Sequence, residues 1–554
     1  MCGFVERSTQ VNELHADIAI IGASTGGCAA ALAALRQGRT VVMSESTDWI
    51  GGQFTSQGVP PDEHRYIEYF GSSNSYRRLR RTIRDYYRRN FPLTAAARHD
   101  DFLNPGTGEC STLSCEPRAA LAAFEELFAP YRHAGRLRIV QPYWPTAAHV
   151  DGDRVSAVTV GHRHTGDELN LTAQVFLDGT DLGDLLPLTG TEHVIGAEPA
   201  SQTGEPHGAE GDHEPRTMEA VTWCLAIDHI EGEDYTISKP EHYEHFRDHV
   251  PPHWPGPQLS YVALDYDSMQ PWQHTFLPAV EGGPLWESLW THRRLIDVRN
   301  FEGGLYPSDI VLVNWTQNDY FGGPIVGIEP DEAAYHLSMS RELSLSLVYW
   351  LQTEAPRVDG GTGFPGIRLR GDVMGSDDGL ALAPYVREGR RIQARTTIYE
   401  QDISAEVRTD GPRTFPDSVG VGYYFLDMHQ RTEGRVPFLT QVWPYQIPLT
   451  ALVPVRMRNL LPACKNLGVT HVTNSAFRLH PIEWCVGEAA GCLAAFCAEH
   501  GTEPQAVADS EGLTRAVQDL VIAQGQEIEW PSFSPVGRWF EHLAYTVDKS
   551  HLRS

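Results

Sequence analysis

An apolar segment, a glycine-rich turn and an alanine-rich segment follow one another near the start of the chain, and they constrain its fold most strongly. Asp17 to Ile21 (DIAII) is a short apolar run, as expected for a parallel strand buried on both faces. After the turn, an alanine- and leucine-rich segment continues to Gly38 and is typical of a helix packed closely on a sheet. Thr40 to Glu45 (TVVMSE) is predicted as the next strand. The sequence therefore predicts the first unit of a parallel α/β sheet.

The turn fits the pattern G-x-G-x-x-G except at its second glycine, which is Ser24. Gly22 permits a tight turn, the small Ser24 lets a pyrophosphate approach the backbone, and Gly27 lets the helix lie close to the strand. The N-terminus of the helix would supply unpaired N–H groups and a partial positive charge. The predicted phosphate-binding residues are Gly22, Ala23, Ser24, Thr25, Gly26 and Gly27.

Glu45 ends the predicted second strand 23 residues after Gly22, where a carboxylate can accept hydrogen bonds from both ribose hydroxyls of an adenosine. It would also repel a 2′-phosphate. A second glycine pair follows at once, in a segment that can run closely under an extended cofactor and that a nicotinamide-binding unit would not need. Its predicted binding residues are Ser46, Gly51, Gly52, Gln53 and Thr55.

Two other glycine patterns lack this context. Gly361 to Gly366 also matches G-x-G-x-x-G, but no strand enters it and no helix leaves it, so a loop is predicted. Gly420 to Gly422 lacks the third glycine and adjoins an aromatic run. We therefore predict a single nucleotide-binding unit.

Charge and cysteine content exclude several classes of protein. A formal net charge of -28 disfavours nucleic-acid and anionic-membrane partners, because phosphate groups repel acidic surfaces. The N-terminal sequence lacks a basic flank followed by an apolar run, and no stretch approaches the ~20 apolar residues of a spanning helix, so a cytoplasmic protein is expected. Nine scattered cysteines do not resemble a secreted disulfide framework.

Three further segments have recognisable patterns. Tyr76 to Asn90 (YRRLRRTIRDYYRRN) predicts a helix with arginines on most faces, either solvated or salt-bridged between domains. Thr146 to Leu177 contains three strand-like runs separated by the turn signals of residues 151–153 and 165–167, which predicts a small antiparallel meander. Ile482 to Glu499 predicts a second alanine-rich helix.

The chain resembles the FAD-dependent oxidoreductases related to the flavoproteins of fumarate reductase and succinate dehydrogenase. The resemblance lies in Trp49 to Gln53 (WIGGQ), in Asp178 to Asp184 (DGTDLGD), and in NLLPACKNLGVTH with RLHPIEWCVGEAAG near the end of the chain. It departs from the family pattern at Ser24, at Gly179 in place of alanine, and at Lys465 in place of arginine. The resemblance implies bound FAD, with the helix near Ile482 directed at the pyrimidine end of the flavin. It adds the binding residues Asp178, Thr180, Pro481, Ile482 and Glu483.

The expected fold class is α/β, with a Rossmann-like FAD-binding domain that has a parallel sheet and a β-meander, plus an inserted mixed α+β substrate domain. The FAD-binding domain is expected to be discontinuous, over residues 14–195 and 436–505, with a partly helical insert at 61–130. Residues 196–435 are assigned to the substrate domain and 506–554 to a C-terminal helical extension. Neither composition nor pattern indicates an oligomeric state.

The sequence contains no recognisable NAD(P)H module, so the flavin is expected to be reduced by a small-molecule substrate, through hydride transfer from a C–H bond to flavin N5. A substrate hydroxyl or amine must then lose a proton to a base. His480 and His471 in the flavin segment are candidates for this base, Arg478 could orient a carboxylate or stabilise the reduced flavin, and Glu483 could tune either histidine. His480 could instead cap the following helix. Tyr423, Tyr424 and His429 form a second candidate cluster.

Several alternatives remain open. Cys110 and Cys115 have the C-x4-C spacing of a flavin disulfide reductase, although they lie far beyond the first βαβ unit. A non-catalytic dinucleotide-bound scaffold and a flavin lyase or isomerase are also possible. Tryptophans of the middle region could stack on a sugar or an aromatic ring, or could pack in a core: Trp223, Trp254, Trp272, Trp286, Trp290 and Trp315. His242, His245, His249 and His253 recur at spacings of three and four, but a solvated face is favoured over zinc, so no metal is predicted.

Overall fold

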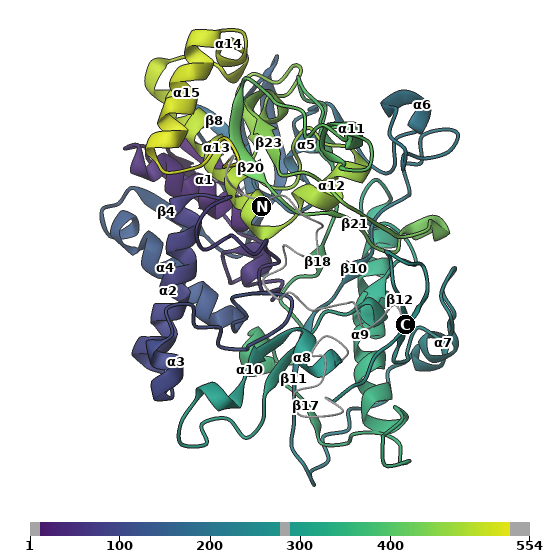
Figure 1. Cartoon of the computed structure of the whole chain (residues 1–554). Coiled ribbons are helices and arrows are strands. Elements are labelled where there is room, and N and C mark those ends of the chain that lie inside the picture. Colours follow the sequence, from purple (N-terminus) through teal and green to yellow (C-terminus); the bar gives the residue numbers. More distant parts are fainter. Residues whose placement is uncertain (1–11, 278–287, 532–554) are drawn as a thin grey trace, which may run out of the picture.

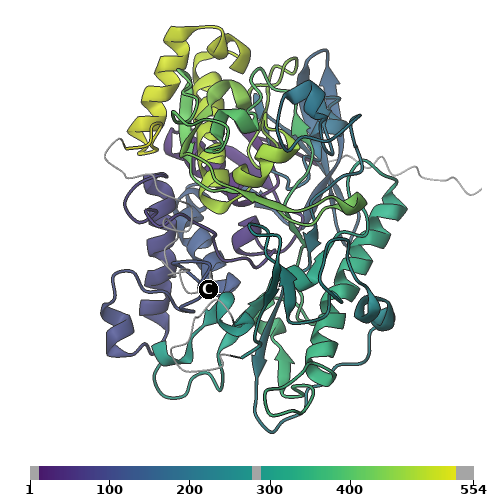
Figure 2. The same ribbon diagram turned by 45° about the vertical axis from the view of Figure 1, so that its right-hand side comes forward.

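The computed structural model describes residues 12–277 and 288–531. It has a mixed α/β fold built around one parallel sheet and several antiparallel sheets, which confirms the predicted fold class. Elements from both ends of the chain, purple and yellow in Figure 1, lie together at one end of the molecule, and the elements of the middle region extend from them. Figure 2 shows the same arrangement from a second direction.

The parallel sheet has five strands in the order β24-β8-β2-β3-β4, and all four pairings are parallel. Its strands come from three separate parts of the chain. They are β2 (Ile18–Ile21), β3 (Val41–Ser44), β4 (Leu137–Val140), β8 (Val175–Asp178) and β24 (Leu460–Pro462). The two strands predicted at the start of the chain are therefore central and neighbouring strands of this sheet.

Helices cover one face of this sheet and the meander covers the other. Ile18 and Ile20 join a core with helices α1 (Thr25–Arg36) and α13 (His480–His500), whereas Ala19 and Ile21 pack with the meander. This division follows from the alternation of side chains along a strand. The meander contains β5 (Tyr143–Asp151), β6 (Arg154–His162) and β7 (Glu168–Thr172), with β1 (Asn12–His15) parallel to β7. The predicted antiparallel meander is therefore observed over β5, β6 and β7, but residues 175–177, predicted as the end of its third run, belong to β8 of the parallel sheet.

Helices α1 and α13 touch through glycines. A Cβ atom at Gly487 would lie 2.0 Å from the carbonyl oxygen of Gly26, and one at Gly491 would lie 2.3 Å from that of Ala30. Gly487 and Gly491 are four positions apart, so they share one face of α13. The small residues predicted for this segment allow the helix backbones to approach within van der Waals contact.

The arginine-rich segment forms α2 (Asn74–Asn90), which packs on α4 (Pro117–His133). Arg80 and Arg84 are fully buried, and both form ion pairs with Glu68. Arg80 also pairs with Glu63. The salt-bridged alternative therefore describes the inner face of the helix, while Arg78 and Arg81 on the outer face are exposed.

The middle region includes a four-stranded and a three-stranded antiparallel sheet and one long helix. Strands β14 (Arg294–Ile296), β15 (Ile310–Val313), β11 (Leu225–His229) and β17 (Ile367–Leu369) form a four-stranded sheet that shares a core with α9 (Pro330–Thr353). A three-stranded sheet consists of β16 (Asp319–Tyr320), β10 (Val221–Thr222) and β18 (Tyr385–Val386). The predicted loop at Gly361 to Gly366 is confirmed, since it lies between α9 and β17. Gly420 to Gly422 belongs to β20 (Ser418–Gly422), which pairs with β23 (Tyr445–Pro448).

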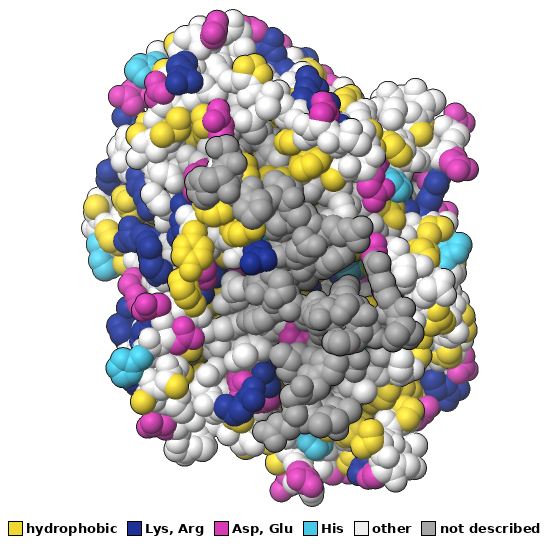
Figure 3. Space-filling model, viewed as in Figure 1, with side chains coloured by type: hydrophobic (Ala, Val, Ile, Leu, Met, Phe, Trp, Pro, Cys, Tyr) yellow, Lys and Arg dark blue, Asp and Glu magenta, His cyan; other side chains and the backbone are white. Residues whose placement is uncertain are grey.

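The surface carries both signs of charge despite the net charge of -28. Lysine, arginine, aspartate and glutamate side chains are interspersed over the face shown in Figure 3. None of the helices within the described ranges combines the length and the apolar character that a membrane span requires.

Candidate functional site

The carboxyl ends of β2, β3 and β8 meet at the glycine-rich turn. The amide of Gly22 donates to the carbonyl of Ser44 over 3.1 Å, and the amide of Gly179 donates to the carbonyl of Ile21 over 2.7 Å. Gly22 has φ +95°, and a Cβ atom there would lie 2.5 Å from the carbonyl carbon of Gly179. Both its conformation and its surroundings therefore require glycine.

Ser24, the irregular residue of the turn, is the N-cap of α1. Its hydroxyl accepts a hydrogen bond from the amide of Gly27 over 3.1 Å. An N-cap side chain satisfies an amide that the helix leaves without an internal partner. Serine at this position thus keeps the turn compact and begins the helix at Thr25, within the glycine-rich motif.

Glu45 lies just beyond β3 and is buried beside the turn. Its carboxylate accepts hydrogen bonds from the amide of Ala23 over 3.1 Å and from the amide and hydroxyl of Thr47, each over 2.9 Å. Burial raises the pKa of Glu45 to about 7 against the opposing effect of Thr47. Hydroxyl donors from a ribose would favour the ionised form of such a carboxylate.

The second glycine pair packs directly on the turn. Gly51 and Gly52 both have positive φ, and the hydroxyl of Thr25 donates to the carbonyl of Gly51 over 2.9 Å. A Cβ atom at Gly52 would lie 2.9 Å from the Cα atom of Ser24. Thr55 closes this segment by donating to the carbonyl of Ile50 over 2.7 Å. The structure therefore brings together the two glycine motifs that the sequence predicted to serve one cofactor.

Glu483 connects these motifs with the end of the chain. It lies in the first turn of α13, and its carboxylate accepts a hydrogen bond from the amide of Gly26 over 2.9 Å. The side chains of Gln53 and Cys464 also donate to it. A carboxylate at this position shows that the N-terminus of α1 attracts negative charge, as a pyrophosphate site must.

Asp178 and Thr180 form the third predicted part of the site. Asp178 is fully buried at the end of β8, and it accepts hydrogen bonds from the amide and hydroxyl of Thr180 over 3.0 Å and 2.7 Å. Burial raises its pKa to about 7. Nearby, the buried Lys465 forms an ion pair with the half-buried Asp181. A lysine thus supplies the positive charge at the position where the family commonly has arginine.

The residues present fit a flavin dinucleotide. The turn, the acid after β3, the second glycine pair and the first turn of α13 all lie around the carboxyl edge of the parallel sheet, where α/β folds bind dinucleotides. Two buried amide oxygens there, Oε1 of Gln53 and Oε1 of Gln57, have no hydrogen-bond partner within the structure. Pro481 and Ile482 are buried in the first turn of α13, directly before Glu483.

His480, a predicted catalytic residue, is enclosed beside the second glycine segment. Its Nε2 atom lies 3.0 Å from the carbonyl of Val59, and its ring packs edge-to-face on Phe54 with centroids 4.7 Å apart. Burial lowers the pKa of His480 to about 4, so the ring is neutral at neutral pH. The helix cap is Leu479, and His480 is the first helical residue.

The other two predicted catalytic residues belong to separate ion networks. Arg478 donates to the hydroxyl of Tyr385 over 2.9 Å and to the carboxylate of Asp427 over 3.2 Å. His471 begins α12 (His471–Phe477), and its Nδ1 atom lies 2.8 Å from the carboxylate of Glu388. Its Nε2 atom faces the guanidinium of Arg431 at 3.4 Å. His471 and Arg478 therefore contact different carboxylates, Glu388 and Asp427.

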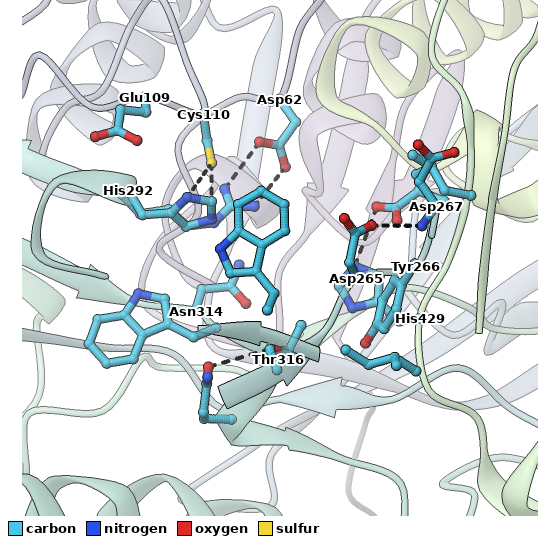
Figure 4. A pocket seen from close by; sticks show the side chains of 18 of the residues that line it. Asp62, Glu109, Cys110, Asp265, Tyr266, Asp267, His292, Asn314, Thr316 and His429 are labelled. Atoms are coloured by element: carbon cyan, nitrogen blue, oxygen red, sulfur yellow. Dashed lines mark hydrogen bonds and ion pairs between the residues drawn. The ribbon is translucent and has the colours of Figure 1, made fainter. Parts of the chain in front are cut away.

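Asp427, the partner of Arg478, also lines a cavity of about 360 Å³. Figure 4 shows side chains from distant parts of the chain pointing into it, with Glu109, Cys110 and His292 on one side and Tyr266 and His429 on the other. Neither His471 nor His480 lines it. Its principal polar and aromatic lining residues are Asp62, Glu109, Cys110, Tyr266, Trp272, His292, Arg293, Trp315, Arg387, Tyr424, Asp427 and His429.

Asp62 is held in the cavity by a two-pronged ion pair. Nη1 and Nη2 of Arg293 lie 3.1 Å and 3.3 Å from its two carboxylate oxygens. The adjacent Glu63 points the other way, where it accepts hydrogen bonds from Arg80 of α2 and, over 2.6 Å, from the hydroxyl of Tyr76. The buried arginine of α2 therefore anchors the loop that presents Asp62.

His429 lies between two carboxylates. Its Nδ1 atom is 2.7 Å from Asp319 and its Nε2 atom is 3.3 Å from Asp427. Burial and the nearby Arg387 act to lower the pKa of His429, but the two carboxylates outweigh them and the pKa is raised. His429 in turn lowers the pKa of Asp427, which falls to about 2 despite the burial of this carboxyl. The two carboxylates therefore favour the imidazolium form of His429.

Cys110 and His292 form a neutral pair on the opposite side. The Sγ atom of Cys110 lies 3.2 Å from Nε2 of His292 (Figure 4). Burial raises the pKa of Cys110 to about 12 and lowers that of His292 to about 3, so neither group is charged at neutral pH. Glu109 adjoins them, and burial raises its pKa to about 7 against the effects of Thr291 and Arg294.

The remaining candidate residues lie in three settings. Tyr424 and His429 of the second candidate cluster line the cavity, whereas Tyr423 packs against Trp530. Trp272 and Trp315 line the cavity, Trp290 is buried in the middle core, and Trp286 lies outside the described residues.

The four spaced histidines do not share a helical face. Only His245 lies within α7 (Tyr243–Asp248), since His242 and His249 flank its two ends. Among the described residues, no group of three or more His, Cys, Asp or Glu side chains is placed to hold a metal ion.

Sequence reasoning missed most of the cavity. Asp62, Glu109, Arg293 and Asp427 come from four segments with no common pattern. One signal was present for Asp62, because the polar DEH run of residues 62–64 follows the second glycine motif and two prolines. Arg293 and Glu109 carried no comparable signal.

Residues 17–521 match a family described as FAD dependent oxidoreductase. No curated protein matches the chain. Among solved structures, a geranylgeranyl bacteriochlorophyll reductase-like protein from Thermoplasma acidophilum is 10% identical, over 93% of this chain and 85% of that one, with a TM-score of 0.31.

Two similar structures cover less of the chain. The FAD complex of glycerol-3-phosphate dehydrogenase from Bacillus halodurans is 13% identical over 39% of this chain, with a TM-score of 0.23. L-proline dehydrogenase from P. horikoshii is 15% identical over 34%, with a TM-score of 0.17. The chain spans 40% of the length of the first and 25% of the second. At these TM-scores the likenesses carry no argument about substrate.

Proposed function

The chain belongs to the FAD dependent oxidoreductase family, and from this membership we propose that it oxidises a small-molecule substrate bound in the cavity beside Asp427. FAD, the cofactor of this family, supplies a two-electron acceptor that takes a hydride from a substrate C–H bond at flavin N5. A closer kinship with the fumarate reductase and succinate dehydrogenase flavoproteins is part of the proposal, supported by Trp49 to Gln53 and Asp178 to Asp184.

One contact carries the proposal. Arg478 lies two residues before the helix whose first turn belongs to the proposed FAD site, and its guanidinium binds Asp427 in the cavity wall over 3.2 Å. A substrate in this cavity is therefore next to the segment that closes the flavin site. The proposed FAD-binding unit consists of residues 14–195 and 436–505, with 196–435 as the substrate unit, and this contact lies where the two units meet.

The proposed FAD-binding residues act in three groups. The amides of the turn from Gly22 to Gly27 and the start of α1 hold the pyrophosphate, in the position where Gly26 now donates to Glu483. Glu45, with Ser46 beside it, accepts hydrogen bonds from the ribose. The segment from Gly51 to Thr55, with Asp178, Thr180 and the first turn of α13, borders the rest of the cofactor.

The substrate must also lose a proton, and we assign its acceptor to Glu109. A general base works best when its pKa lies near the working pH, and burial raises the pKa of Glu109 to about 7. His429 is less suited, because two carboxylates raise its pKa and so favour its protonated form. It donates hydrogen bonds instead. Arg478 positions Asp427. His480 and His471 do not line the cavity, and they hold the flavin-binding segment in place through their own buried contacts.

The rival disulfide reductase receives less support. A redox-active pair requires a thiolate at working pH, whereas burial raises the pKa of Cys110 and of Cys115 to about 12. Both are free thiols.

Anaerobic mixing of the FAD-loaded protein tests the proposal. NADH and NADPH should leave the flavin oxidised, whereas the substrate should bleach its visible band. Arg478→Met should retain FAD and its bleaching by dithionite but lose most of its reduction by substrate. Arg515→Met, at an exposed ion pair with Asp519, is the matched control and should behave as the native protein does. Rapid bleaching by NADH or NADPH, or full substrate reduction in Arg478→Met, would contradict the proposal.

A further inference from the structure

The cations that line the cavity already have carboxylate partners. Arg293 binds Asp62 with both of its terminal nitrogens, Nη1 and Nη2, and Arg387 lies 2.9 Å from Asp319. His429 is flanked by Asp319 and Asp427. A carboxylate or phosphate on a substrate would have to compete with these buried partners. The lining therefore offers an anionic substrate little attraction.

Two of the carboxylates that line the cavity are matched in the same way. Asp62 is held by Arg293, and Asp427 is held by both Arg478 and His429. Asp265, which is half-buried, accepts hydrogen bonds from the amides of a turn, and Asp267 is exposed; neither forms an ion pair within the described residues. Glu109, with a pKa of about 7, is half protonated at neutral pH. The carboxylates deepest in the lining therefore offer a cationic substrate little unpaired charge.

The paired groups still offer hydrogen bonds. The carboxylates of Asp62 and Asp427 have further acceptor positions, and arginine side chains have further donors. These hydrogen-bonding groups come from different walls of the cavity. Figure 4 shows Asp62 on one side and His429 on another. Such a lining suits a ligand that carries several hydroxyl groups, because each hydroxyl donates and accepts at once.

Aromatic rings supply the rest of the lining. Trp272, Trp315, Tyr266 and Tyr424 all border the cavity. Aromatic faces bind C–H groups by dispersion and by the negative charge of the ring. A sugar ring has an apolar C–H face and an edge of hydroxyls, and so matches both parts of this lining. The volume of about 360 Å³ lies at the small end of the range for ligand pockets.

We propose that the cavity binds a neutral polyhydroxylated ring, a sugar or a cyclic polyol, against its aromatic wall and between its ion-paired side chains. This assignment rests on the proposed function, because it names the substrate class of the same site. The reaction converts a substrate CH–OH group to C=O. The hydride goes to FAD, the hydroxyl proton goes to the carboxylate of Glu109, and molecular oxygen or another two-electron acceptor then reoxidises the flavin.

Three probes of nearly equal size separate charge from shape. Glucose is neutral, glucuronate is anionic and glucosamine is cationic, and all three form the same six-membered ring. Their binding to the FAD-loaded protein is measured by saturation-transfer NMR and by quenching of tryptophan fluorescence, which do not require turnover. Glucose should bind at least about tenfold more tightly than either charged probe. Trp272→Ala should weaken glucose binding about tenfold and Trp272→Phe by less, whereas Trp144→Ala, on the exposed strand β5, should not change it.

The outcomes distinguish this assignment from the proposed function. A flavoprotein that prefers glucuronate or glucosamine, or that binds none of the three, overturns the assignment and leaves the proposed function intact. Glucose binding that is unchanged in Trp272→Ala also overturns it. A protein that binds no FAD overturns the proposed function itself.

Discussion

Ser24 shows how one residue can depart from a motif and still serve it. The second glycine of the dinucleotide fingerprint permits close approach of the backbone, and serine is small enough to keep that approach. In this chain the serine hydroxyl also caps α1 through the amide of Gly27. N-cap serines typically stabilise a helix by about 1 kcal/mol relative to alanine. Serine in place of the second glycine of the motif therefore adds a hydrogen bond at the start of α1.

Glu109 gives a prediction for the pH dependence of catalysis. As the proton acceptor it must be ionised, so anaerobic reduction of the flavin by substrate should accelerate as pH rises through about 7 and then level off. Stopped-flow measurement from pH 5.5 to 8.5 tests this. Glu109→Gln should slow reduction by about a hundredfold or more and remove the pH dependence. A Glu109→Gln protein with the native profile would show that another group accepts the proton.

Cys115 tests the disulfide reductase alternative without touching the cavity. It is buried and does not line the cavity, so Cys115→Ala removes one member of the C-x4-C pair only. We expect the substrate-dependent rate of flavin reduction to change less than about twofold. Loss of reduction in a variant that keeps its FAD and its thermal stability would instead favour a dithiol mechanism.

The proposed cofactor site depends on the close contact between helices α1 and α13. Gly487→Ala would place a Cβ atom 2.0 Å from the carbonyl oxygen of Gly26, a backbone atom at the start of the phosphate-binding helix. Overpacking of this kind typically costs about 1–3 kcal/mol, and more where backbone must move. The free energy of unfolding, measured in urea, should fall by at least that amount, and FAD affinity should fall with it.

Gly512→Ala is the matched control for this prediction. Gly512 lies in the first turn of α15 (Glu511–Ala523), is exposed, and has no close neighbour at its Cβ position. Alanine should be neutral there or stabilising by up to about 1 kcal/mol. Equal effects of the two substitutions would show that the helix contact is not as close as described.

Elements with local signals could be predicted from the sequence, and elements that depend on distant partners could not. The strand, turn and helix from Ile18 to Arg36 are encoded in consecutive residues, as is the meander. The buried face of α2 was only partly predictable, because Arg80 and Arg84 are buried by carboxylates that precede the helix, Glu63 and Glu68. Their charge pattern alone is equally typical of a solvated helix.

The candidate site divides in the same way. Gly22 to Gly27, Glu45 and Gly51 to Gln53 lie within about 30 residues of one another and have recognised spacing, so their meeting could be predicted. The cavity could not, since Glu109 and Arg293 meet only through the packing of the middle region. His480 and His471 were chosen for their chemistry and their place near the flavin motif. The structure places both outside the cavity lining, and only Arg478 of that group contacts it.

At the scale of the whole molecule, buried carboxyl groups make stability depend on pH. Burial raises the pKa of Glu45, Asp178 and Glu205 to about 7, above their values in the unfolded chain. Between about pH 4.5 and 7 the folded protein therefore binds more protons, and its stability falls as pH rises. Groups with a lowered pKa act in the opposite direction. Asp427, at about 2, does so only below about pH 4, whereas the buried His292 and His480, at about 3 and about 4, do so up to about pH 6.5 and offset part of this effect.

The FAD-free protein should accordingly be more stable at pH 5 than at pH 8, by a few kcal/mol as an order of magnitude. Thermal unfolding at the two pH values measures this. The double variant Glu45→Gln, Asp178→Asn should show a smaller difference, because neither side chain can ionise. Bound FAD should also reduce the difference, since ribose hydroxyls favour the ionised form of Glu45. A native protein without FAD that is more stable at pH 8 would contradict this account of the buried carboxyls.

The central claim is that both ends of the chain form one FAD site at the edge of the parallel sheet. The most direct test is the visible absorption spectrum of the purified protein, followed by acid precipitation and mass spectrometry of the flavin in the supernatant and of the pellet. The account predicts a yellow protein with one equivalent of FAD, either released or attached to the chain. A colourless protein that takes up no FAD when the cofactor is added would contradict it.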